Sequence, residues 1–188
     1  MTAVALLLAL LAQPDVANLR RELAVQHVRE VLDSLRKNDP SQQIYFEFAE
    51  SEVNDYLAYA LKADPRPGIQ EASVRLTGSN RLTASLLVDF DAVKSWDASL
   101  IPAEMAPALT GRKMVKVDAE FAVKDRRVLL KTHSMELADL KLAPPVFQPM
   151  LNAIAARQPE KYDLTRPVTL PFELRTVWIR DRILGGEK

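Results

Sequence analysis

The sequence contains no cysteine, only two histidines and no excess of charge of either sign. Without cysteine the chain has no disulfide, no thiolate nucleophile and no thiolate metal ligand, and it fits any cellular compartment. Its 25 basic and 25 acidic side chains give a formal net charge of zero at pH 7. No long-range electrostatic field therefore favours a nucleic-acid backbone, and we expect no nucleic-acid partner.

Long hydrophobic runs are also lacking, with one exception near the N-terminus. Residues 3–12, AVALLLALLA, are ten consecutive apolar residues, which is the length of a signal-peptide core and about half of a membrane-spanning helix. Only Met1 and Thr2 precede them, without Lys or Arg. We expect residues 1–13 to form an export or anchoring segment; the alternative is that they are the buried first turns of a helix. Residues 14–188 have the length of one domain with a single core.

A long helix is predicted directly after this segment. Between Pro14 and Lys37, apolar residues recur three and four positions apart, which is the spacing of an amphipathic helix about 35 Å long. We assign the following residues to its apolar stripe: Val16, Leu19, Leu23, Ala24, Val28, Val31, Leu32 and Leu35. His27 lies beside this stripe without a second ligand-type residue on the same face, so we interpret it as a boundary residue rather than a metal ligand.

The stretch FEFAESEVNDYL, residues 46–57, combines four carboxylates with an asparagine and raises the question of acid/base or metal chemistry. The residues that lead into this stretch alternate as a strand, and the later residues of the stretch follow a helical stripe. Glu50 and Glu52 then lie in the first helical turn, where backbone N–H groups and the helix dipole favour negative charge. Asn54 and Asp55 project from the polar face, and no metal or catalytic set is completed. We therefore predict a structural role for this stretch.

Two β-hairpins follow, which are recognised by the alternation of apolar and polar residues. The first hairpin has a three-residue loop containing glycine, with Thr77 opposite Arg81. The second turns at residues 125–126 and places Val123 opposite Val128. In both hairpins this register puts the apolar residues of the two strands on one shared face.

The polar face of the second hairpin contains the nearest approach to a catalytic dyad. The predicted register places Asp118 opposite His133 and Glu120 opposite Lys131, and the two aspartates of residues 88–91 would extend an acidic patch if the hairpins are neighbours. No strained strand-to-helix turn with serine or threonine and no glycine-rich phosphate loop accompanies them. We interpret these residues as solvated cross-strand pairs. A hydrolase remains the less favoured alternative, and we expect no enzymatic activity, no catalytic residue, no metal and no cofactor.

Two apolar segments punctuated by proline stand out, residues 94–113 between the hairpins and residues 142–157 after them. Their prolines forbid long regular elements, and both are too apolar to be free linkers. They must pack on the core or form a movable cover over an apolar opening. The second segment is predicted to form a short helix after its double proline. The chain then closes as one strand at residues 166–184, with a bulge or bend near residues 175–176.

Four stretches, in chain order, are ESEVNDYL, RLTGSNRLTASLLVDF, LAPPVFQPMLNAI and TLPFELRTVWIRDRIL. Together with the order of elements they resemble the small bacterial envelope proteins related to the tubular lipid-binding (TULIP) superfamily, each half of a unit of the bactericidal/permeability-increasing protein type. The resemblance spans about Ile44 to Leu184. It implies an α+β fold, in which a long N-terminal helix packs on a curled antiparallel β-sheet with two shorter helices. It also implies a protein that binds or handles lipid in the periplasm or cell envelope, with possible membrane association through its N-terminus.

A physical mechanism for lipid binding is compatible with this fold. A sheet curled around a long helix leaves an apolar slot wherever side chains do not fill the gap, and an acyl chain gains about 0.8 kcal/mol per CH₂ buried there. Because methionine repacks easily around variable chains, we place these tentative ligand-binding residues near the mouth: Met105, Met135, Phe147, Met150 and Leu151. The alternatives are that all five are plain core and that the protein is an envelope scaffold with a filled core.

Overall fold

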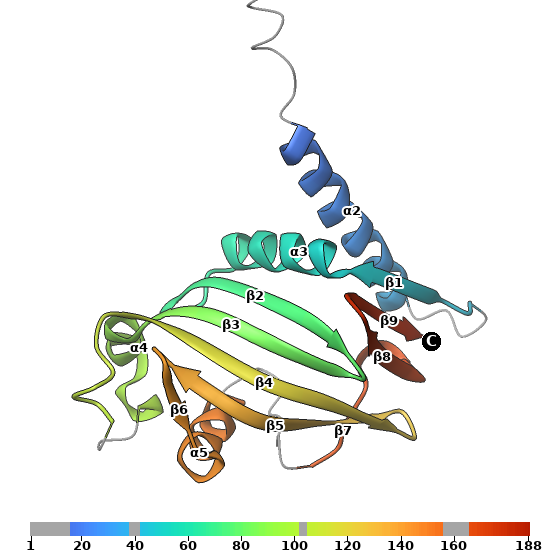
Figure 1. Cartoon of the computed structure of the whole chain (residues 1–188). Coiled ribbons are helices and arrows are strands. Elements are labelled where there is room, and N and C mark those ends of the chain that lie inside the picture. Colours follow the sequence, from blue (N-terminus) through green and yellow to red (C-terminus); the bar gives the residue numbers. More distant parts are fainter. Residues whose placement is uncertain (1–15, 38–41, 102–104, 156–165) are drawn as a thin grey trace, which may run out of the picture.

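The chain folds as an α+β protein with an N-terminal helix and two antiparallel sheets (Figure 1). The computed structural model describes residues 16–37, 42–101, 105–155 and 166–188, leaving aside the side chains at 150 and 153–155. The predicted export or anchoring segment lies outside these ranges. Within them the chain has four α-helices, so three shorter helices rather than two accompany the long one.

The larger sheet has six antiparallel strands. Its main path runs in the order β2-β3-β4-β5-β6, and β7 pairs with the opposite end of β5. The strand bounds are β2 Ile69–Gly78, β3 Arg81–Asp89, β4 Arg112–Lys124, β5 Arg127–Leu137, β6 Leu140–Leu142 and β7 Val168–Thr169. The two predicted hairpins are β2–β3 and β4–β5, and they are neighbours because β3 pairs with β4.

The observed register confirms the second hairpin turn and corrects the first. Val123 lies opposite Val128, as predicted. Gly78 rather than Thr77 lies opposite Arg81, because the ladder shifts by one residue just before the turn. The first turn therefore has two residues instead of three, and both have positive φ, which matches the right-handed twist of the flanking strands.

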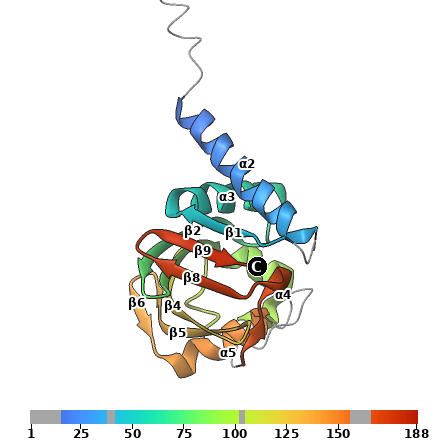
Figure 2. The same ribbon diagram turned by 90° about the vertical axis from the view of Figure 1, so that its right-hand side faces the viewer.

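The smaller sheet has three antiparallel strands in the order β1-β9-β8 and faces the viewer in Figure 2. Its strands are β1 Tyr45–Ala49, β8 Thr176–Arg180 and β9 Ile183–Glu187. The prediction of one bent strand over residues 166–184 is wrong, because this stretch contains β7, the 3₁₀ helix η2 (Pro171–Glu173), β8 and the turn into β9. Phe172 and Glu173, with φ of 56° and 59°, end the extended backbone, close to the predicted break.

Asn80, in the β2–β3 turn, joins the two sheets. Its backbone N–H donates to the carbonyl oxygen of Ile179 on β8 (3.0 Å), and its side-chain Oδ1 accepts from the N–H of the same residue (2.8 Å). Its own carbonyl oxygen accepts from the N–H of Phe121 on β4 (2.8 Å). One turn residue with φ of 58° thus bonds to two strands, β8 of the smaller sheet and β4 of the larger one, which fixes the two sheets against each other.

Helix α2 (Val16–Arg36) crosses helix α3 (Glu50–Ala63), which runs beside the edge strand β2 (Figures 1 and 2). The second half of α2 packs on the smaller sheet, in a cluster that we call the α2 cluster. Its buried members are Val28, Leu35, Phe46, Phe48, Leu170 and Leu174. The predicted apolar stripe of α2 is only partly buried, because Val16, Leu19 and Leu23 are exposed.

Helix α4 (Phe90–Asp97), the 3₁₀ helix η1 (Ala98–Leu100) and helix α5 (Pro144–Ala155) contribute to the cover of one face of the larger sheet. The fully buried Phe147 on α5 and Phe90 at the start of α4 pack against residues of β3, β4 and β5. The two proline-punctuated segments thus pack on the core, which is one of the two outcomes predicted from the sequence.

Candidate functional site

The candidate site is the hydrophobic cluster between the larger sheet and its helical cover, which we call the α4–α5 cluster. Strands β3, β4 and β5 supply one side of it, and α4, η1 with the residues that follow, and α5 supply the other. Its buried members are Val88, Phe90, Ile101, Leu109, Val115, Met135, Leu137 and Phe147. It is separate from the α2 cluster, so the domain has two hydrophobic centres rather than the single core that the sequence predicted.

Four of the five predicted ligand-binding residues meet in this cluster. Met135 on β5 and Phe147 on α5 are buried, with exposed fractions of 2% and 0%, and Met105 and Leu151 pack against them while partly exposed. The side chain of Met150 lies outside the described part of the structure. The four lie between the larger sheet and its cover, whereas Val28 and Leu35 of the long helix α2 belong to the other cluster.

The chain segment between α4 and β4 is fixed by polar contacts at both of its ends. Asp89 caps α4, since its Oδ1 accepts from the N–H groups of Asp91 and Ala92 (3.1 and 3.2 Å). Asp91 Oδ2 accepts from the N–H of Gly111 (3.0 Å). Lys94 Nζ donates to the carbonyl oxygen of Ala106 (2.8 Å). Asp89 and Asp91 therefore both bond backbone N–H groups and have structural roles next to α4.

Exposed apolar side chains lie on the same elements that enclose the α4–α5 cluster. Trp96 on α4 is 56% exposed, Leu140 on β6 is 61% exposed and Val146 on α5 is 44% exposed. None of these three was predicted from the sequence to be a site residue. Leu140 belongs to a strand of three residues, too short for an alternating pattern, and Trp96 precedes the prolines of an irregular segment.

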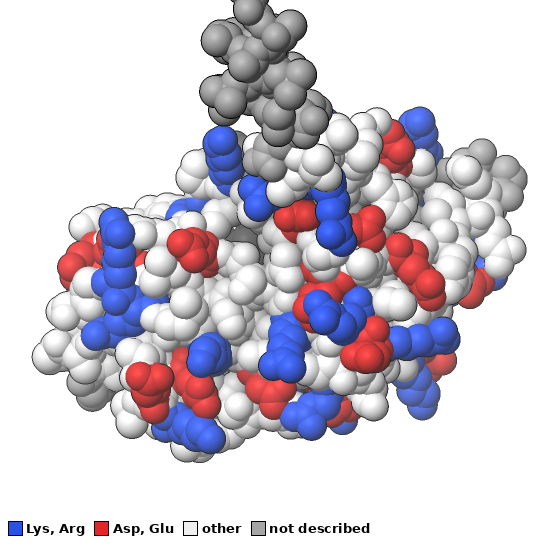
Figure 3. Space-filling view, turned by 45° about the horizontal axis from the view of Figure 1, so that its top comes forward, with Lys and Arg blue, Asp and Glu red and all other residues white. Residues whose placement is uncertain are grey.

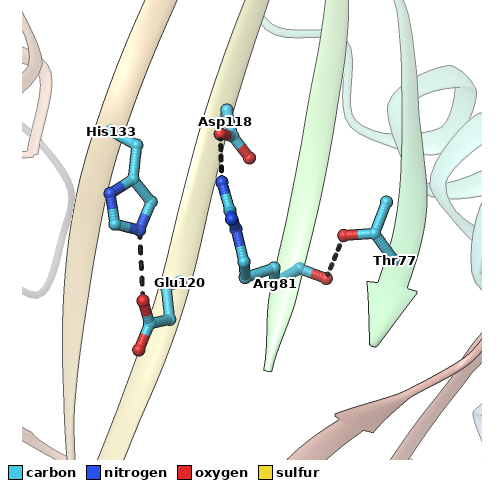
Figure 4. Close-up of polar contacts among 5 residues, drawn as sticks. All are labelled: Thr77, Arg81, Asp118, Glu120 and His133. Atoms are coloured by element: carbon cyan, nitrogen blue, oxygen red, sulfur yellow. Dashed lines mark hydrogen bonds and ion pairs between the residues drawn. The ribbon is translucent and has the colours of Figure 1, made fainter. Parts of the chain in front are cut away.

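The opposite face of the larger sheet is polar, and Figure 4 shows its central ion pairs. The predicted pair of Asp118 and His133 is not formed. Asp118 lies opposite Ser134 and bonds Arg81 (2.7 Å), while His133 Nε2 lies 3.1 Å from Glu120 Oε2. The reason is a β-bulge after Asp118, which moves the partner strand by one residue and so changes every cross-strand neighbour beyond it.

A shallow hollow of about 580 Å³ lies on this polar face, lined by residues including Thr83, Lys116 and Glu136. A second hollow of about 710 Å³ lies between α2 and α3, where the guanidinium of Arg29 stands 5.6 Å from the ring centre of Tyr59. Both hollows are lined by charges of both signs. Figure 3 likewise shows basic and acidic side chains intermixed over the face seen from above in Figure 1.

The acidic stretch that follows β1 completes the edge of the larger sheet. Asn54 receives a hydrogen bond from the N–H of Val74 (2.7 Å) and donates one to its carbonyl oxygen (2.9 Å). Glu50 Oε2 accepts from the N–H of Leu76 (2.7 Å). These side chains bond backbone groups of the edge strand β2, which would otherwise be open to another strand. The predicted structural role is confirmed, although Asn54 faces the sheet and not the solvent.

Glu52, one turn into α3, connects the start of this helix to α2. Its Oε2 accepts from the N–H of Ala49 (2.7 Å), and its Oε1 lies 2.8 Å from His27 Nδ1. Asp55 forms an ion pair with Arg21 (3.3 Å). Glu52 therefore positions the start of α3, and both Glu52 and Asp55 have a partner on the neighbouring helix α2.

Within the described ranges, no three His, Asp or Glu side chains gather in a way that could hold a metal ion. No helix in the same ranges is long and apolar enough to cross a membrane.

On β1, the hydrogen bond from the Tyr45 hydroxyl to Glu47 (2.6 Å) raises the pKa of this exposed phenol.

Comparison with protein family models, with curated proteins and with solved structures gave no match to this chain. The resemblance to TULIP-related envelope proteins therefore stays a prediction from the sequence.

Proposed function

We propose that this protein binds lipid in the bacterial cell envelope without catalysing a reaction. An acyl chain would occupy an apolar slot between the larger sheet and its cover of α4 and α5. The observation that carries the proposal is the α4–α5 cluster, in which Met105 and Met135 pack beside Phe147 beneath short helices. Methionine side chains adapt to guests of variable shape more readily than branched ones.

The exposed apolar residues on the enclosing elements support an entrance to this slot. Trp96, Leu140 and Val146 come from α4, β6 and α5, the elements that would part from each other if the cover opened. The proposal also takes the larger sheet to curl toward its cover, since a curled sheet leaves a channel where a flat one leaves only a face.

The free energy gained by burying an acyl chain can exceed the free energy needed to open the cover. A chain of about fourteen CH₂ groups gains ~11 kcal/mol on burial, at about 0.8 kcal/mol each. An opening cost of about 3 kcal/mol would still leave ~8 kcal/mol, which corresponds to a micromolar dissociation constant. The slot therefore does not need to stand open in the free protein.

The envelope location rests on residues 1–13 and on the resemblance. An apolar run of ten residues at the N-terminus is typical of export or anchoring segments. A fusion of residues 1–20 to a reporter that is active only in the periplasm would test this location, and a reporter that stays cytoplasmic would contradict it.

A scaffold protein with a filled core is the second candidate. It is favoured by the burial of Phe147 and Leu109, each with an exposed fraction of 0%, because side chains that are fully enclosed without a ligand fill the space that the ligand would need. The two candidates differ in one measurable property, the saturable uptake of an acyl probe.

The test is titration of the full chain with a fluorescent sixteen-carbon fatty acid. Met105→Trp should fill the proposed slot and weaken uptake at least tenfold, because the larger side chain occupies the volume of the guest. Met114→Trp is the matched control: Met114 precedes Val115 on β4 and therefore lies on the opposite face of the sheet. Both variants must unfold at temperatures close to that of the parent.

Loss of uptake in Met105→Trp with full uptake in Met114→Trp would support the slot. Absence of saturable uptake in the parent protein would refute lipid binding and leave the scaffold. Equal weakening by both substitutions would show that the probe binds elsewhere. Native mass spectrometry of the purified protein, followed by lipid extraction, would identify a lipid that is already bound.

A further inference from the structure

The first half of α2 projects from the domain with an apolar face that nothing in the described structure covers. Every residue from Val16 to Leu23 is exposed, and the first buried residue of the helix is Ala24. Among them, Val16, Leu19 and Leu23 are 75%, 47% and 57% exposed. Figure 1 shows this end of α2 extending beyond α3, away from both sheets.

These three residues lie on one side of the helix, because their spacings of three and four positions keep them within one face at 3.6 residues per turn. The buried residues Ala24, Val28 and Leu35 lie on a different face, turned by about 100° or more around the helix axis by the same geometry. The exposed apolar face is thus not an extension of the face that packs on the domain.

The neighbouring sequence indicates what this face contacts. The apolar run of residues 3–12 ends only three residues before α2 begins, so an apolar segment and an apolar helix face follow one another along the chain. Arg20 lies within the projecting turns, and an arginine side chain at such a position can reach anionic headgroups while its alkyl stem remains in apolar surroundings. Arg21, in contrast, pairs with Asp55 of α3.

A second copy of the helix is a weaker partner for this face. Stable coiled coils need apolar positions over three to four heptads, and the exposed set here ends at Leu23, since Gln26 and His27 occupy the next positions of the stripe. An interfacial helix needs only a short apolar face beside basic residues.

We propose that the first two turns of α2 lie in the interface of a lipid bilayer, with Val16, Leu19 and Leu23 toward the acyl region and Arg20 toward the headgroups. This deepens the proposed envelope function by naming the membrane as a partner of α2, and it rests on that envelope location. It does not depend on uptake of an acyl chain, so the two ideas can fail separately.

Because the chain has no cysteine, single cysteines can report which side of the helix meets the bilayer. Leu23→Cys and Asn18→Cys, each in the full chain and labelled with an environment-sensitive dye, would be mixed with vesicles of phosphatidylethanolamine and phosphatidylglycerol. Asn18 lies in the same two turns but off the apolar face. The dye at position 23 should shift to the blue and be quenched by brominated acyl chains, while the dye at position 18 should change much less.

Vesicle sedimentation of the full chain provides the second measurement. The variant Val16→Ser/Leu19→Ser/Leu23→Ser should partition at least tenfold more weakly than the parent, because three apolar side chains no longer leave water. The control Asn18→Ser changes the same turns off the face without a change of charge and should partition as well as the parent. Since the three substituted residues are exposed, the triple variant should take up the fatty-acid probe as the parent does.

Equal quenching at positions 18 and 23, or unchanged partitioning of the triple variant, would overturn the proposal and leave membrane attachment to the upstream segment alone. A dimer of the parent that the three serines dissociate would overturn it in favour of a second copy. Normal vesicle binding without probe uptake would refute the slot and keep the interfacial helix.

Discussion

Replacement of Asn54 by alanine should destabilise the protein more than replacement of the next residue of α3, Asp55. The amide makes two hydrogen bonds, one with the N–H and one with the carbonyl oxygen of Val74, at 2.7 and 2.9 Å. It thereby bonds to the backbone of edge strand β2 in the way that another strand would. Alanine leaves both backbone groups without this partner at a half-buried position.

The magnitude follows from the two bonds and from the groups left behind. Each hydrogen bond contributes about 0.5–1.5 kcal/mol net, and leaving the backbone groups of Val74 unsatisfied raises the total to about 2–4 kcal/mol. The higher helix propensity of alanine offsets roughly 0.6 kcal/mol of this. We expect a net loss of about 2–3 kcal/mol, and a fall in Tm of roughly 4–12 °C for a chain of this size.

Urea unfolding of the Asn54→Ala variant would measure this loss, with Asp55→Ala as the matched control. Asp55 is the next residue of α3, and its ion pair with Arg21 joins side chains that are 27% and 63% exposed. Its removal should cost no more than about 1 kcal/mol. Amide exchange at Val74 should accelerate in Asn54→Ala only. If the two variants agree within about 0.5 kcal/mol and Val74 exchanges as before, α3 does not protect the edge of β2 through Asn54.

Two further substitutions test how the smaller sheet is held. Asn80→Gly should lower the free energy of unfolding by about 1 kcal/mol, because it removes the bond to the N–H of Ile179. Asn80→Ala should lower it by about 1–2 kcal/mol more, because φ is positive at this residue. Equal urea midpoints for the two variants would contradict this reasoning. At Gly185, a Cβ would overlap the indole of Trp178, so Gly185→Ala should cost about 1–3 kcal/mol in the parent and less in a Trp178→Ala background. A penalty that does not change in that background would show that the indole is not its cause.

Much of the fold could be predicted because local patterns and tertiary contacts agree. The two hairpins of the larger sheet follow from alternation, and the register at Val123 and Val128 follows from the turn. Helix α4 was missed, although Asp89 provides a signal: an aspartate whose side chain accepts from the N–H groups two and three residues later is a helix N-cap. The alternation of β3 continued into Phe90 and concealed that start.

Elements that depend on a single residue of register were missed. The bulge after Asp118 changes the phase of β5: the face that carries Val128 and Leu130 near the turn carries Met135 and Leu137 beyond the bulge. His133 lies at this change and meets Glu120 instead of Asp118. The two-residue turn through Asp181 and Arg182 likewise moves the shared face from Val177 and Ile179 to Leu184. A pattern interpreted with one continuous period does not represent either change of face.

For the candidate site, the types of residue in each segment predicted which side chains lie together, but not which helices cover them. Met105, Phe147 and Leu151 meet Met135 of β5 because large apolar residues in proline-punctuated segments have few places to be buried other than a sheet face. These residues pack with α4 and α5 and not with the long helix, because the apolar residues of the chain are distributed over two separate hydrophobic clusters. That division is set by tertiary packing of the smaller sheet, whose strands β8 and β9 were not recognised.

The two faces of α2 were nevertheless present in the sequence. Val16, Leu19 and Leu23 are spaced by three and four positions, and Ala24, Val28, Val31 and Leu35 by four, three and four. Each set is a regular stripe, but they are offset where Leu23 and Ala24 are adjacent, and adjacent residues of a helix point about 100° apart. One helix with two offset stripes requires two apolar partners. The domain supplies the partner of the second stripe, and the first stripe needs a partner of its own.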